Sequence, residues 1–152
     1  KFKFLESINV KKIIPSSINI NLSKTSILGK TFINGEEFYI GKNGEFINHN
    51  QIFEKYTIPT IFGEFELKEF LNLYDTLNNQ MLEINKIKYF YYFKNRRWDL
   101  VFTNGLTLKL PSKNMINSIK IYKKLLDNKN LTNTKIIDLR VTDQIIMTNK
   151  NE

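Results

Sequence analysis

Residues that could carry out chemistry are few in this chain of 152 residues. His49 is the only histidine and cysteine is absent, so a transition-metal site would have to gather carboxylates around one imidazole. His49 also stands in the polar stretch NHNQ without an identifiable serine or threonine partner for nucleophilic catalysis. We therefore expect neither a metal site nor a cofactor, and we do not expect an enzyme.

Two further patterns have structural explanations. Gly35, Gly41 and Gly44 lie in hairpin context rather than between a strand and a helix, so they predict turns and not a phosphate-binding loop. Asp138 and Arg140 lie two positions apart on a predicted strand and therefore face the same side. An ion pair between them is favoured over a catalytic role.

The stretch KIKYFYYFKNRRW, residues 86–98, interleaves cations with aromatic rings, as a surface for single-stranded nucleic acid would. A strand pair that buries its aromatic side chains and exposes its cations explains the same pattern, and is favoured because the glycines of the RRM aromatic motif are missing. The net charge of +8 fits an acidic partner, but it also fits the lysine-rich composition that an A/T-biased genome produces.

Length and composition indicate one domain, or one domain with part of another, and enough apolar residues for a core: 41% of the chain is hydrophobic. No apolar run approaches the roughly 18 to 20 residues of a membrane span. Without cysteine, the redox compartment stays open. The first residue is Lys rather than Met, so we expect an upstream segment that would hold any signal or membrane anchor.

Alternating apolar and polar residues predict two hairpins in the first third of the chain. Residues 7–12 and 17–22 form the first, with Pro15 between them. Residues 36–41 and 45–48 form the second, in which Asn-Gly at 43–44 supplies the positive φ angles of the turn.

Apolar residues at helical spacing predict two amphipathic helices. The first lies between Gly63 and Asn79 and has glutamates at its start, where the helix dipole favours negative charge. The second runs from about Lys113 to Leu126, after Pro111, with Ser112 as the N-cap. The expected buried stripes are Leu67, Phe70, Leu71, Tyr74 and Leu77 in the first helix, and Met115, Ile119, Tyr122 and Leu126 in the second.

The last third predicts further strands. The apolar alternation changes phase near Asn85, which indicates a bulge or break. A three-residue loop, Thr103–Gly105 with a left-handed Gly105, is favoured over a two-residue loop because it pairs apolar with apolar residues. Those pairs are Phe102 with Leu106, Leu100 with Leu108 and Trp98 with Leu110. Residues 135–141 and 143–148 form a final hairpin through Thr142 and Asp143. The expected fold class is α+β, a mainly antiparallel sheet with two amphipathic helices packed on one side.

Five stretches, in this order, resemble the bacterial cell-division family FtsQ/DivIB over nearly the whole chain. They are FLESINVKKIIPSSININL (4–22), EEFYIGKNGEFI (36–47), IPTIFG (58–63), RRWDLVFTNGLTLKL (96–110) and IIDLR (136–140). The first matches the pattern of the last POTRA strands at Val10, Lys11 or Lys12, Pro15, Ile18 and Ile20. Two departures stand out: SKTSILGK (23–30) replaces the usual hinge pattern E-R-x-P-x-A, and Val141 replaces a residue that is often aromatic, before a turn without its common glycine.

The resemblance implies that residues 1–27 are the C-terminal part of a POTRA domain and residues 28–152 an FtsQ-type β-domain. It implies a non-enzymatic scaffold of the division machinery, anchored in the inner membrane by a segment outside this chain, with this part facing the periplasm. The implied partners are FtsB-like and FtsL-like bitopic proteins and other members of the machinery, and not nucleic acid.

The last strand is a candidate for partner binding. Ile145, Ile146 and Met147 place apolar side chains on both faces of a strand that could form the edge of the sheet. A partner strand could pair with it by β-augmentation, unless a neighbouring strand already covers that edge. Basic side chains nearby would accept acidic partner residues and tune specificity. The predicted partner-binding residues are Arg97, Lys120, Lys123, Lys124, Val141, Thr142, Asp143, Gln144, Ile145, Ile146, Met147 and Thr148.

Overall fold

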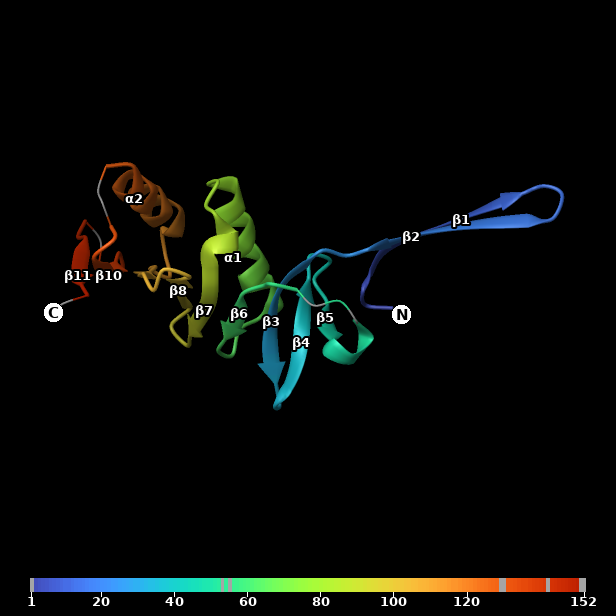
Figure 1. The fold of residues 1–152 in the computed structure, drawn as a ribbon, viewed down its shortest axis with the longest axis horizontal. Helices are drawn as coiled ribbons and strands as arrows, with labels where there is room; N and C mark the ends of the chain where they lie inside the picture. Colours follow the sequence, from blue (N-terminus) through green and yellow to red (C-terminus); the bar gives the residue numbers. More distant parts are fainter. Residues whose placement is uncertain (1, 53, 55, 129–130, 142, 151–152) are drawn as a thin grey trace. The chain divides into compact units, whose positions relative to one another are not determined.

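A computed structural model describes residues 2–52, 54, 56–128, 131–141 and 143–150. The chain divides into two compact units, residues 1–58 and 59–152. Figure 1 labels the helices and strands along the chain. Within the described ranges, none of the helices has the length and apolar character needed to cross a membrane. The structure is mostly sheet with two α-helices, so the predicted α+β class is confirmed.

The first unit contains a hairpin and a three-stranded antiparallel meander. Its elements are β1 (Leu5–Ile13), β2 (Ser17–Lys24), β3 (Ile27–Ile33), β4 (Glu36–Gly41), β5 (Phe46–Asn48) and the 3₁₀ turn η1 (His49–Gln51). Both predicted hairpins are confirmed, although in the second turn only Gly44 has positive φ.

β3 was not predicted, because ILGKTFI lacks clean alternation between apolar and polar residues. The signal that was missed is the turn that follows it: Asn34 (φ 52°) and Gly35 (φ 84°) are an Asn-Gly pair in left-handed conformations between β3 and β4. Half of segment 23–30, which the sequence suggested as a hinge, therefore belongs to this strand.

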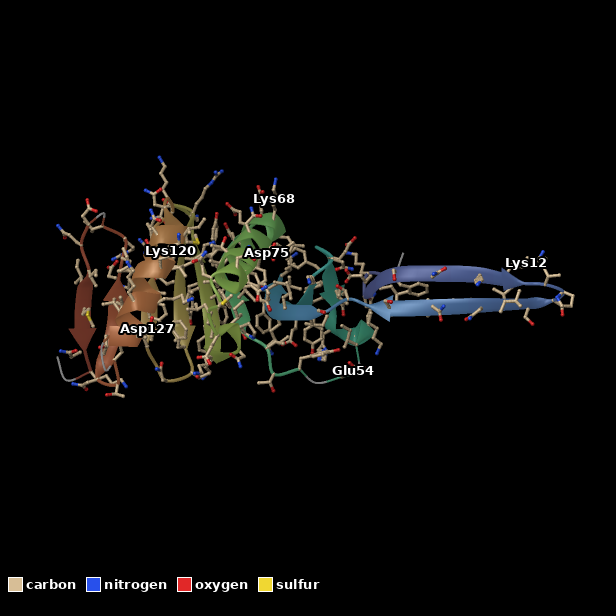
Figure 2. All side chains as sticks on the ribbon, turned by 90° about the horizontal axis from the view of Figure 1, so that it is seen from above. Lys12, Glu54, Lys68, Asp75, Lys120 and Asp127 are labelled. Carbon is tan, nitrogen blue, oxygen red and sulfur yellow. The ribbon has the colours of Figure 1, made fainter. Side chains whose placement is uncertain are left out.

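The β1–β2 hairpin is an amphipathic ribbon. Ile8 pairs with Leu22 and Val10 with Ile20, so these four side chains share one face together with Ile18. All five are exposed. The opposite face carries serines, asparagines and Lys11 for most of its length. Figure 2 shows Lys12 near the tip. A two-stranded ribbon with one bare apolar face is marginal by itself in water.

The described part of the second unit contains two helices and six strands of a mixed sheet, in the order β11-β10-β9-β8-β7-β6. Its elements are β6 (Thr60–Phe62), α1 (Leu67–Asn79), the 3₁₀ turn η2 (Ile84–Lys86), β7 (Ile87–Phe93), β8 (Arg97–Phe102), β9 (Thr107–Lys109), α2 (Met115–Asn128), β10 (Thr134–Asp138) and β11 (Ile146–Asn149). The pairs β6–β7 and β9–β10 are parallel, and the other three are antiparallel.

Each parallel pair is joined by one helix: α1 connects β6 to β7, and α2 connects β9 to β10. β6 and β9 point the same way, and both crossovers move in the same direction across the sheet. Because such crossovers are right-handed, α1 and α2 must cover the same face. Phe70 of α1 meets Phe90 at 5.5 Å between ring centroids, and Tyr122 of α2 meets Phe102 at 5.6 Å.

Register sorts the side chains of this sheet into two faces. One cross-strand row is fully buried beneath the helices and consists of Ile61, Phe90, Leu100, Leu108 and Ile137. The next row points to the face without helices and consists of Phe62, Tyr91, Asp99, Lys109, Asp138 and Ile146. We call the second surface the open face.

The helices follow the prediction with shifts of position. α1 buries Phe70, Leu73 and Leu77 and starts with a capping box formed by Glu66 and Glu69. α2 begins three residues after Ser112, so Ser112 is not its N-cap. Leu125 is buried while Leu126 is 45% exposed, which corrects the expected stripe.

The details of the last strands were predicted in part. The phase change near Asn85 is the 3₁₀ turn η2, and the register irregularity lies later, between Ile87 and Tyr89. The three-residue loop is confirmed: Gly105 has φ 85°, and Leu100 pairs with Leu108. The N–H of Phe102 donates to the carbonyl of Leu106 at 2.9 Å.

The two faces predict different costs of truncation. Leu108→Ala removes a fully buried side chain of the central row, and we expect a loss of about 2–5 kcal/mol in the free energy of unfolding. Thr107→Ala, one residue away on the open face, should cost less than about 1 kcal/mol. Urea unfolding followed by circular dichroism measures both. Equal losses would contradict the assignment of faces.

Candidate partner-binding edge

β11 is the outer strand of the second unit. It pairs with β10 through Ile137 with Met147 and Asp138 with Ile146. Within the described part of this unit, no strand pairs with its other side. Ile146 is 48% exposed on the open face, whereas Met147 points to the helix face and is half-buried. The last strand thus presents an unpaired backbone edge with apolar side chains on both faces.

The connection between β10 and β11 is longer than predicted. Strand pairing stops at Asp138 and resumes at Ile146, so Val141, Asp143, Gln144 and Ile145 lie in a loop and not in a strand. These four residues are exposed. Thr142 lies outside the described residues. The loop bends back on itself through a hydrogen bond from the Gln144 N–H to the Val141 carbonyl at 3.3 Å.

This loop forms one wall of a groove of about 650 Å³ at the end of the sheet where β8 begins and β10 ends. The start of α2 forms another wall. Its apolar lining includes Ile121, Leu139, Val141 and Ile145, and its charged lining is Arg97, Lys113, Arg140 and Asp143. Three cations against one carboxylate make the lining basic.

Arg140 is already paired. Its Nε donates to both carboxylate oxygens of Asp138, at 2.8 and 3.0 Å, and its backbone N–H donates to the same carboxylate. These hydrogen bonds from Arg140 hold the pKa of Asp138 below its usual range. The predicted ion pair between Asp138 and Arg140 is therefore confirmed.

Arg97 has a looser contact with its aspartate. Arg97 Nε and Asp99 Oδ1 are 3.9 Å apart, and both atoms are buried without a hydrogen-bond partner. The guanidinium carbon lies 4.2 Å from the ring centroid of Phe93. Asp99 is only 7% exposed, and this burial raises the pKa of its carboxyl group, against the opposing effect of Arg97 and Lys109.

Comparison with known proteins identifies the family. The model of the C-terminal part of cell-division protein FtsQ/DivIB matches residues 32–140. The chain belongs to the FtsQ/DivIB family. The match extends across the boundary between the two units.

Two cell-division proteins are similar to this chain over most of its length. The cell-division protein FtsQ of Rhizobium meliloti (strain 1021) is 24% identical over 143 residues, which cover 93% of this chain and 46% of that protein. FtsQ of Rhizobium radiobacter shows the same identity over 93% of this chain and 68% of its own length. The chain thus spans about half to two-thirds of these relatives. The extracytoplasmic domain of DivIB from Geobacillus stearothermophilus superposes with a TM-score of 0.45 at 11% identity, over 71% of this chain and 99% of that chain.

The lysines predicted to contact a partner lie on α2 of this FtsQ/DivIB domain, but they do not line the groove. Lys120 and Lys124 are exposed, and Figure 2 shows Lys120 on the helix. Lys123 Nζ donates to the carbonyl of Gln80 at 2.6 Å, which ties α2 to the end of α1. Sequence analysis missed Lys113, which lies two residues before α2 and lines the groove.

The basic aromatic stretch divides between the two faces of the sheet. Phe90 and Tyr92 pack with Trp98 beneath the helices, at 6.4 and 4.8 Å between ring centroids. Tyr89 and Tyr91 gather with Phe62 on the open face. The aromatic side chains thus do not form one continuous platform, and membership in FtsQ/DivIB gives the nucleic-acid alternative no support.

His49 lies in η1, and its ring centroid is 5.6 Å from that of Tyr39. Among the residues that the structure describes, no group of three or more histidine or acidic side chains is placed to hold a metal ion.

The ion pair at the groove predicts a pH-dependent contribution to stability. Asp138→Asn should lower the free energy of unfolding by about 1–2 kcal/mol at neutral pH, because it removes charge-assisted hydrogen bonds. The pKa of Asp138 is lowered in the folded state, so this contribution is present above the unfolded pKa and is lost as pH falls through the folded one. Urea titrations from pH 7 to pH 3 should show the two proteins converging. Asp75→Asn, on the exposed side of α1, is the control, and a difference that persists at low pH would contradict the assignment.

Proposed function

We propose that this chain is the partner-binding part of a non-enzymatic scaffold of the division machinery. It acts on the periplasmic side of the inner membrane and binds FtsB-like and FtsL-like proteins by strand addition to β11. The observation that carries the proposal is the unpaired edge of β11, with apolar side chains on both faces and a basic groove at its N-terminal end. Membership in a family of cell-division proteins supports the biological setting.

The register of the sheet specifies what an added strand must look like. Its residue beside Met147 would point to the helix face, and its residue beside Ile146 would lie on the open face. Covering both side chains calls for consecutive apolar residues in the partner. A residue beside Thr148 would be polar. In this mode main-chain hydrogen bonds supply affinity, and the alternating side chains supply specificity.

The groove extends this interface beyond the strand. Its apolar residues, among them Val141 and Ile145, continue from Ile146 along the chain, and its cations exceed its carboxylates. A partner segment that leaves the added strand toward the groove would therefore carry apolar and acidic side chains. Arg97 takes an acidic residue there. Lys120 and Lys124 can add only the small contribution of exposed ion pairs, about 0.2–1 kcal/mol each.

The β1–β2 hairpin supports a second part of the proposal. Residues 1–27 are the last strands of a POTRA domain, and residues 28–152 are the FtsQ-type β-domain. The ribbon has one apolar face, formed by Ile8, Val10, Ile18, Ile20 and Leu22, that is exposed in this chain. The remainder of a POTRA domain in a longer protein would cover that face, and a membrane anchor would precede it.

A matched pair of substitutions tests strand addition. Ile146→Lys places a charge on the edge strand, and Ile116→Lys places one at a site of equal exposure on α2, 49% against 48%. With the periplasmic segment of the FtsB-like protein from the same genome, we expect Ile146→Lys to weaken binding at least about tenfold, or about 1.4 kcal/mol. Ile116→Lys should bind as the wild type does.

Isothermal titration calorimetry at two salt concentrations measures the dissociation constants of the wild type and of the two variants. Circular dichroism verifies that each protein is folded. The wild-type affinity should change little with salt, because most of the contact is backbone and apolar. Absence of binding by the folded wild type, or equal loss in the two variants, would reject strand addition at β11.

A further inference from the structure

Two arginines line the groove, and each has an aspartate two positions away in sequence: Arg97 with Asp99 on β8, and Arg140 with Asp138 of β10. The two aspartates belong to one cross-strand row of the open face, with Lys109 of β9 between them. The pairs are therefore equivalent in sequence spacing and neighbours in space. They differ in how the charges meet.

In the Arg140 pair, the guanidinium and the backbone N–H both donate to the carboxylate. This carboxylate compensates the charge of Arg140 at close range, and the bidentate geometry fixes the side chain. A partner carboxylate would have to displace Asp138 to gain the same hydrogen bonds. Arg140 is thus a poor anchor for an acidic partner in this protein.

In the Arg97 pair, the facing atoms are 3.9 Å apart, beyond hydrogen-bond distance, and both are buried and unpaired. The guanidinium stacks over Phe93 instead. Asp99 attracts Arg97 without using its Nε–H. The charged groups facing Asp99 are Arg97 on its own strand, Lys109 on β9, and Asp138 and Arg140 on and after β10. Across from it on β7 is Tyr91.

We infer that Asp99, which does not line the groove itself, is a specificity-determining residue beside it, because it competes with partner carboxylates for Arg97. This inference rests on the proposed function and adds that Asp99 controls the affinity of Arg97 for acidic groups of the partner. The ionised Asp99 weakens the binding of an acidic group to Arg97 by partial charge compensation. Replacing it with the isosteric, neutral asparagine removes the competitor while the strand and the stacking of Arg97 on Phe93 are kept.

The first test needs no division protein. Citrate, a tricarboxylate, is titrated into the full chain labelled with ¹⁵N-arginine, and the Nε–Hε resonances of Arg97 and Arg140 report where it binds. In Asp99→Asn the dissociation constant at Arg97 should fall about threefold to fivefold, as expected for loss of one loose ion pair without a hydrogen bond. In the wild type, the Nε–Hε resonance of Arg97 should shift more on addition of citrate than that of Arg140.

Asp75→Asn is the control, because it makes the same change in net charge on α1, outside the groove. It should leave the constant unchanged. An unchanged constant in Asp99→Asn, or the same gain in Asp75→Asn, overturns the inference. A stronger response at Arg140 than at Arg97 in the wild type also overturns it.

The second test uses the FtsB-like segment in a double-mutant cycle. Asp99→Asn should tighten binding by a similar factor in the wild-type background and not in Arg97→Gln. A purely structural effect of Asp99→Asn would persist in Arg97→Gln and would contradict the inference. If the wild type binds citrate as expected but not the segment, the proposed function fails and the competition at Arg97 stands.

Discussion

The register of six strands is the constraint on which the rest of the second unit depends. One cross-strand row, from Ile61 to Ile137, is buried under both helices, so a shift of one residue in any strand would bring its open-face side chain into the core. In β8, β9 and β10 that side chain is charged. The two right-handed crossovers fix the helices on one side. This arrangement leaves the opposite side open, leaves β11 at the edge, and puts Asp99, Lys109 and Asp138 next to one another on three strands.

Features that depend on neighbours in sequence could be predicted. The three-residue loop between β8 and β9 was predicted from a glycine at position 105 and from the match of apolar pairs, and the structure confirms it. The ion pair between Asp138 and Arg140 was predicted from their spacing, and it forms although β10 ends at Asp138 and Arg140 follows the strand. The edge position of the last strand followed from its terminal location and from its apolar residues on both faces. The residues that carry each of these predictions are close to one another in sequence.

Features that depend on tertiary packing could not be predicted. No local pattern in the sequence predicts that β9 pairs with β10, because a helix of 14 residues lies between them. Without that pairing, neither the groove nor the position of Lys113 in it could be predicted. Lys123 looks free on a helical wheel but is bound to the end of α1. The difference between the two Arg–Asp pairs is likewise a matter of distances that equal spacing conceals. The Asn34-Gly35 turn is a different case, since that signal was present in the sequence and was overlooked.

Hydrogen exchange of the β11 amides tests strand addition most directly, because the mode requires new main-chain hydrogen bonds at that edge. The chain is exchanged with and without a saturating amount of the FtsB-like periplasmic segment, and protection is followed by peptide in residues 146–149. β5 (Phe46–Asn48), the outer strand of the meander in the first unit, serves as an internal reference. The account predicts new protection in 146–149 and none in 46–48. Binding that leaves 146–149 unprotected would contradict it.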